Sequence, residues 1–149
     1  MIGTFNLCLS HSHDHRTLKI FICVISNFKY QCQRTDKNFA CVVAHGAILR
    51  IYEKKPLVAD QVAVNYRKAD ISPRQRAMLD FAMKVCLRSH EIGDGDFEAL
   101  HPHGFDDEDI WDIAAITAFF GLSNRMASFS NMMPNPEFYL MGRVPREKK

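Results

Sequence analysis

The chain of 149 residues contains no apolar run long enough to cross a membrane. Its longest such run near the start, Ile20–Ile25, is far shorter than the roughly 20 residues that a membrane-spanning helix needs. Residues 1–15 also lack the early positive charge, the unbroken apolar stretch and the small-residue cleavage site of a secretory signal. We therefore expect a cytoplasmic protein that does not act on membranes.

The chain also lacks a large net charge and a regular cysteine framework. Its formal charge of +2 is too close to zero to favour binding to nucleic acid or to anionic lipid. The five cysteines are an odd number without regular spacing, at positions 8, 23, 32, 41 and 86. This pattern indicates free thiols in a reducing compartment rather than a set of disulfides. With 47% hydrophobic and 24% charged residues, the composition fits one soluble globular domain.

Apolar periodicity and start signals predict helices throughout the chain after about residue 39. Ser72, Pro73 and Gln75 are typical of a helix start, and Asp106 is the expected N-cap of the last long helix. We therefore predict an all-α protein. Two long helices are expected over about 39–54 and 56–67. A third should run from Ser72 to near Gly93, and a fourth from Asp106 to a break at 131–136. Short helices are expected over 97–101 and 137–141.

Residues 1–40 differ from the rest, because the periodicity expected of amphipathic helices is poor there. We expect three parts, namely a diverged or poorly ordered segment over 1–40, a helical domain over 41–143 and a solvated tail over 144–149. The first part holds an alternating tract of His11, His13 and His15. Such a tract in a terminus is more often adventitious than a metal site, so we predict no metal ligands.

The stretch from Cys41 to Arg50 places a thiol and an imidazole in one predicted helix. Cys41 and His45 are four residues apart, so both side chains are expected on one face, one turn from each other. The thiolate is the reactive form of cysteine, and a neighbouring imidazole can take the proton of the thiol. The same spacing also suits a cysteine and a histidine that are simply packed in an apolar helix. The pair is a candidate redox site with a structural alternative.

Four further motifs accompany this pair, over Ala59–Arg67, Ser72–Phe81, His103–Asp112 and Leu122–Ala127. Together with the Cys41/His45 helix, they resemble the carboxymuconolactone decarboxylase-like superfamily, specifically its AhpD-like branch of peroxidase-related enzymes. The resemblance covers roughly residues 41 to 143, about two-thirds of the chain. It implies an all-helical AhpD-like domain that forms homo-oligomers, commonly trimers or hexamers, and that carries a thiol peroxidase site.

In active members of that family the motif is Cys-x-x-Cys-x-x-x-His, and a preceding Glu belongs to a proton relay. The resemblance implies Cys41 and His45 as the catalytic pair, whereas Asn38 stands where the first Cys would be. The relay Glu would lie near Ser26, but the first Glu of this chain is Glu53. A thiol that resolves oxidised Cys41 must then come from another subunit, from a small molecule, or from Cys32 or Cys86.

The function implied by the resemblance is the reduction of hydroperoxides through the Cys41 thiolate, a peroxiredoxin-type activity with a thiol reductant and no cofactor. Turnover is expected to be weak, because Asn38 cannot form a disulfide. Two alternatives remain open: an acid–base enzyme like the decarboxylases that name the superfamily, and a helical scaffold without catalysis. Activity that survives Cys41→Ser would favour the acid–base enzyme, and a thiol pKa near the ordinary value of about 8.5 would favour the scaffold.

Overall fold

The structure is a computed structural model, and it describes residues 39–53 and 55–143. The predicted N-terminal segment lies outside the described residues except for its last two positions, so Cys32, Asn38 and the three histidines of the tract are not described. The predicted tail over 144–149 also lies outside. Both members of the Cys41/His45 pair lie within the described part of the chain.

The described helices are α3 (Phe39–Glu53), α4 (Pro56–Asn65), α5 (Pro73–Arg88), α6 (Asp94–Glu98), α7 (Asp107–Phe129) and α8 (Glu137–Leu140). Short 3-10 turns lie between them, as η1 (Tyr66–Lys68), η2 (Ser89–Glu91) and η3 (His101–His103). The described residues include no strand, so the predicted all-α class is confirmed. None of these helices combines the length and the apolar character that crossing a bilayer requires.

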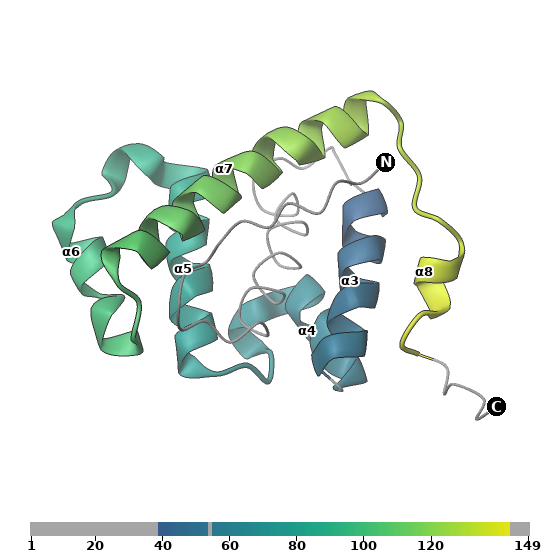
Figure 1. Ribbon diagram of the computed structural model, residues 1–149, viewed down its shortest axis with the longest axis horizontal. Helices are drawn as coiled ribbons and strands as arrows, with labels where there is room; N and C mark the ends of the chain where they lie inside the picture. The colour runs from purple at the N-terminus through teal and green to yellow at the C-terminus, as the bar shows by residue number, and fades with distance from the viewer. Residues whose placement is uncertain (1–38, 54, 144–149) are drawn as a thin grey trace.

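Helix α7 is the longest described element and runs across the other helices (Figure 1). In that view α5 and α3 stand beneath it, with α6 at one end of the molecule and α8 at the other. The most extensive packing joins α3 to α4, α5 to α7, and α3 to α8. One cluster of buried apolar side chains connects α3, α4, α5 and α7, and its most deeply buried large members are Leu49 of α3 and Leu79 of α5.

Two predicted helix starts are confirmed by their capping bonds. The hydroxyl of Ser72 accepts from the Gln75 N–H at 3.2 Å, and the Gln75 side chain accepts from the Ser72 N–H at 2.8 Å. Asp106 and Asp109 exchange the corresponding bonds at the start of α7, at 2.8 and 3.2 Å. These bonds satisfy N–H groups that the first turn of a helix leaves without an intrahelical acceptor.

The region after α5 differs from the prediction. Helix α5 ends at Arg88 rather than near Gly93, and η2 follows it. The short helix predicted over 97–101 is misplaced, because α6 begins at Asp94 and η3 begins at His101. The Asp96 carboxylate accepts from the Gly93 N–H at 2.9 Å, a bond that fixes the first turn of α6 ahead of the predicted position.

A buried arginine of α3 holds the C-terminal arm against that helix. Arg50 is 6% exposed, and its Nε and Nη2 donate to the carbonyl oxygens of Met141 and Phe138, each at 3.0 Å. Gly142 has φ of 77°, and a Cβ there would lie 2.8 Å from the Cβ of Arg50. Position 142 therefore needs glycine both for its left-handed backbone and for this close approach. The short arm predicted over 137–141 is confirmed as α8.

Candidate functional site

Helix α3 carries both members of the predicted pair on one stripe of its surface. Cys41, His45, Ile48 and Tyr52 follow at helical spacing, from partly buried Cys41 and His45 to Tyr52, which is 52% exposed. The opposite side of α3 is buried and includes Gly46, Ala47 and Arg50. Packing of that buried side turns the thiol and the imidazole toward the more open side of the helix.

The imidazole of His45 lies between its own helix and α7. A ring N–H donates to the backbone carbonyl of Cys41, and the Phe120 ring contacts the imidazole edge-to-face, with centroids 5.4 Å apart and planes at 79°. Phe119 in turn contacts Phe120 at 5.7 Å. Burial lowers the pKa of His45 from its ordinary value, and the bond to the Cys41 carbonyl opposes this only in part. The imidazole is therefore neutral at neutral pH.

A neutral imidazole has one N–H donor and one nitrogen lone pair. Because the donor of His45 is committed to the Cys41 carbonyl, the ring is held in one orientation and its second nitrogen carries the lone pair. A lone pair on an oriented ring is what a proton acceptor next to a cysteine requires. The carbonyl bond also belongs to the structural alternative, a histidine that is simply packed, so the geometry allows both roles.

Of the two predicted resolving thiols, only Cys86 lies within the described residues. Cys41 and Cys86 are both outside disulfides. Cys86 lies on α5, which packs chiefly against α7, whereas α3 packs chiefly against α4 and α8. The role of Cys86 as a resolving thiol stays a prediction. Cys32 and Asn38, the other residues that bear on the question, lie outside the described residues.

Two other groups of titratable residues have structural roles. The Asp106–Asp109 cluster forms the cap of α7, as its bonds show. His101 lies within 3.1 Å of the Asp107 carboxylate on the exposed surface. Within 39–53 and 55–143, no three His, Cys, Asp or Glu side chains gather as a metal site would require.

A cluster that the sequence did not single out joins η1 to α5. The Tyr66 hydroxyl donates to the Asp80 carboxylate at 2.6 Å, and Nε of Arg67 donates to the Tyr66 hydroxyl at 3.3 Å. Nε of Arg67 is also 3.4 Å from Asp80. Burial and the bond to Asp80 raise the pKa of Tyr66 to about 12. Tyr66 is thus a hydrogen-bond donor that orients Asp80, and not an acid or base at neutral pH.

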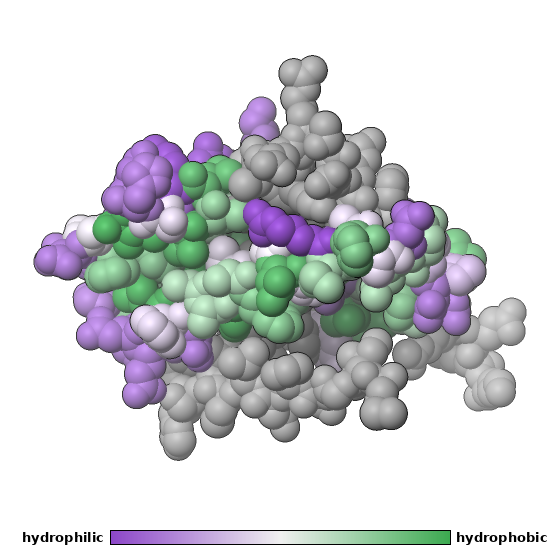
Figure 2. Space-filling view, turned by 90° about the horizontal axis from the view of Figure 1, so that it is seen from above, coloured by the Kyte–Doolittle hydropathy of each residue, from purple (hydrophilic) through white to green (hydrophobic). Residues whose placement is uncertain are grey.

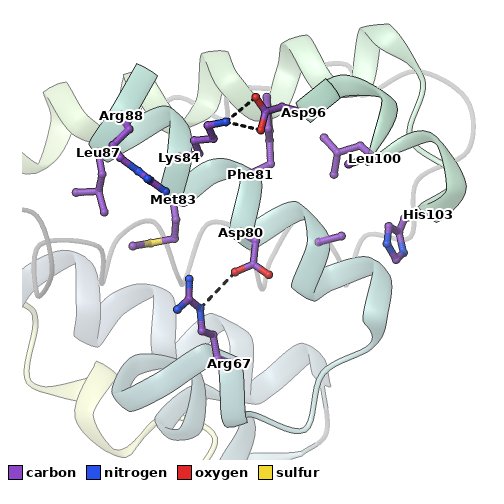
Figure 3. Close-up of a pocket in the computed structure, with 12 residues that line it drawn as sticks. Arg67, Asp80, Phe81, Met83, Lys84, Leu87, Arg88, Asp96, Leu100 and His103 are labelled. Atoms are coloured by element: carbon purple, nitrogen blue, oxygen red, sulfur yellow. Dashed lines mark hydrogen bonds and ion pairs between the residues drawn. The ribbon is translucent and has the colours of Figure 1, made fainter. Parts of the chain in front are cut away.

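A cavity of about 570 Å³ lies beside this cluster, between η1, α5, α6 and η3 (Figure 3). At its far end Lys84 of α5 donates to both carboxylate oxygens of Asp96 of α6, each at 2.7 Å. This contact holds the pKa of Asp96 below its ordinary value. The cavity has no lining residue from α3. Sequence reasoning missed it because its charged residues come from separate elements and share no spacing, namely Arg67, Asp80, Lys84, Arg88 and Asp96.

The solved structures that are similar to this chain include two peroxidase-related proteins. One is the alkylhydroperoxidase AhpD core of an uncharacterized peroxidase-related protein from Ralstonia eutropha JMP134. It is 65% identical with a TM-score of 0.79, and the match covers 93% of this chain and 70% of that one. The other is an uncharacterized peroxidase-related protein from Silicibacter sp. TM1040, which is 41% identical with a TM-score of 0.77, over 91% of this chain and 68% of that one. The chain matches no protein-family model and no curated protein.

The lowered pKa of His45 predicts that folding stability falls in mild acid. Below about pH 6.5 the His45 side chain of the unfolded chain binds a proton, whereas the buried imidazole of the folded protein resists protonation. The stabilisation that depends on the neutral His45 is therefore complete above that pH and is lost below it. Between pH 6.5 and the folded pKa, the free energy of unfolding should fall by up to about 1.4 kcal/mol per pH unit more steeply for the wild type than for His45→Gln. Urea unfolding at a series of pH values measures this difference.

His90→Gln is the matched control for this experiment, because the His90 side chain is 80% exposed. It should keep the pH dependence of the wild type. Identical pH dependence for all three proteins would show that His45 is not buried in its neutral form.

Proposed function

Since the chain belongs to the AhpD-like alkylhydroperoxidase superfamily, we propose that it is an oxidoreductase that reduces hydroperoxides through the thiolate of Cys41. The observation that carries this proposal is that Cys41 and His45 lie on one stripe of α3, where a ring N–H of His45 donates to the Cys41 carbonyl and orients the imidazole. Membership of the family supports a peroxidase-related role, and the site supplies the chemical reason for assigning it to these two residues.

The first half of the reaction needs only this pair. The Cys41 thiol gives its proton to His45, and the sulfur attacks the terminal oxygen of a hydroperoxide. The O–O bond breaks, the alkoxide leaves as the alcohol after taking the proton from His45, and Cys41 becomes a sulfenic acid. Sulfur is oxidised by two electrons and the peroxide is reduced by the same two.

The second half of the reaction needs an external thiol. Its sulfur condenses with the Cys41 sulfenic acid, water leaves, and a mixed disulfide forms. A second thiol then attacks that disulfide and returns Cys41 to the reduced form. We assign this role to a thiol reductant from outside the subunit, because Asn38 replaces the usual partner and Cys86 lies on a helix that packs elsewhere. A reducing cytoplasm would supply such thiols, and turnover should be slow without a built-in partner.

Intact mass after stoichiometric hydroperoxide tests this proposal. The wild type should gain one oxygen at Cys41, or lose two hydrogens if another cysteine of the chain resolves it, and Cys41→Ser should not react at the same rate. Cys86→Ser is the control, because both cysteines are partly buried thiols outside disulfides. It should oxidise like the wild type.

Two results would overturn the thiol mechanism. One is an equal oxidation rate in wild type and Cys41→Ser. The other is peroxide or decarboxylase turnover that survives Cys41→Ser, which would point to the acid–base chemistry of the superfamily. A protein that neither oxidises nor turns over substrate would match the scaffold alternative.

We also propose that the protein is a homo-oligomer whose contact includes the outer face of α7. This face consists of residues that recur at helical spacing and are exposed, namely Trp111, Ala115, Ala118, Leu122, Met126 and Phe129. Trp111 is 75% exposed and Phe129 is 85% exposed. Apolar side chains gather along this side of the molecule in Figure 2. Contiguous apolar surface of this kind supports burial against a second copy.

Light scattering on the purified protein tests this interface. The wild type should be an oligomer. The double variant that combines Leu122→Glu and Phe129→Glu should give smaller particles, because each new carboxylate would be buried in the interface without a partner. Val64→Glu is the control, since Val64 is 88% exposed but lies on α4. A monomeric wild type, or a double variant that assembles unchanged, would contradict the proposal.

A further inference from the structure

The cavity between η1, α5, α6 and η3 is large enough for a small organic ligand. Its volume of about 570 Å³ lies within the range of roughly 300–1,000 Å³ that small-molecule sites occupy. Its walls combine buried apolar side chains, among them Phe81, Met83 and Leu100, with charged groups (Figure 3). This combination suits a ligand that has an apolar body and one charged or polar head.

The two carboxylates of the lining are already engaged by the protein. Asp80 accepts from the Tyr66 hydroxyl and lies 3.4 Å from Nε of Arg67. Asp96 accepts two bonds from Lys84 and one from the Gly93 N–H. A cationic ligand would therefore have to compete with cations that already contact both acids. The lining does not favour a positively charged head.

The cationic groups of the lining, by contrast, retain donors. Arg67 uses its Nε for Tyr66 and Asp80, and among the described residues its two terminal nitrogens meet no acceptor. Arg88 contacts Glu91 through Nη1 at 3.2 Å, and the Arg88 side chain is 61% exposed, so other N–H groups of its guanidinium face solvent. A guanidinium has five N–H donors and no acceptor, and its planar fork matches a carboxylate. The cavity therefore has more hydrogen-bond donors than its own acceptors use.

We propose that this cavity is a second ligand site, which binds a small organic monocarboxylate with its carboxylate on Arg67 and Arg88 and its apolar body against Phe81, Met83 and Leu100. The site is separate from the Cys41/His45 pair, because no residue of α3 lines it. The Lys84–Asp96 bridge joins α5 to α6 and holds the far wall in place. The proposal does not depend on the peroxidase reaction, because none of the cavity residues takes part in it.

Methyl NMR with hexanoate as the probe tests this site. The full-length protein carries a ¹³C-labelled methyl group on methionine, and the signal of Met83, which is 7% exposed and lines the cavity, is assigned with Met83→Leu. Hexanoate should shift this signal saturably. Hexan-1-ol and hexylammonium, which have a similar apolar body and a neutral or positive head, should bind at least about fivefold more weakly.

Variants of the two arginines locate the carboxylate. Arg67→Gln and Arg88→Gln should each weaken hexanoate binding by about fivefold, the value expected for a partly exposed charge-assisted contact. Arg143→Gln is the control, because Arg143 is likewise a surface arginine in an ion pair but contacts Asp60 of α4. It should bind hexanoate like the wild type.

Three results would overturn the proposal. The first is the absence of a saturable shift at Met83 with hexanoate. The second is binding of the alcohol or the ammonium that equals or exceeds binding of the carboxylate. The third is binding that is unchanged in both Arg67→Gln and Arg88→Gln, which would show that the carboxylate lies elsewhere.

Discussion

The packing of α3 on its buried side is the constraint on which the rest of the structure depends. Ala47 has no exposure, and Arg50 is held by carbonyl groups of the C-terminal arm at 3.0 Å. A helix that is fixed along one side presents its opposite side in a defined direction. That direction sets where Cys41 and His45 lie. The charge state of the site depends on the other side of α3, where His45 packs against Phe120 of α7 and burial keeps the imidazole neutral.

The Cys41/His45 pair and the cavity lie in separate parts of the structure and depend on different contacts. The Cys41/His45 pair depends on one helix and on ring contacts with Phe120 of α7. The cavity depends on bonds between elements, where Tyr66 orients Asp80 and Lys84 joins α5 to α6. We propose a nucleophile with a proton acceptor in the first region, and the second region has hydrogen-bond donors beside an apolar wall.

Much of the helical fold could be predicted from sequence, because its signals are local. The caps at Ser72 and Asp106 use partners three residues away, and the shared face of Cys41 and His45 follows from a spacing of four. The burial of His45 against Phe120 and the Tyr66–Asp80 bond could not be predicted, since they depend on how separate helices pack. The similarity to the two solved structures covers 93% and 91% of the chain, more than the two-thirds that the motifs identified.

The pKa of the Cys41 thiol tests the central claim most directly. It can be measured from the pH dependence of alkylation at Cys41, followed by peptide mass, in the wild type and in His45→Gln. The proposed site predicts a thiol pKa below the ordinary value of about 8.5 in the wild type, and a rise toward that value when His45 is replaced. An ordinary thiol pKa that is the same in both proteins would show that His45 does not activate Cys41, and would leave the pair a structural feature of α3.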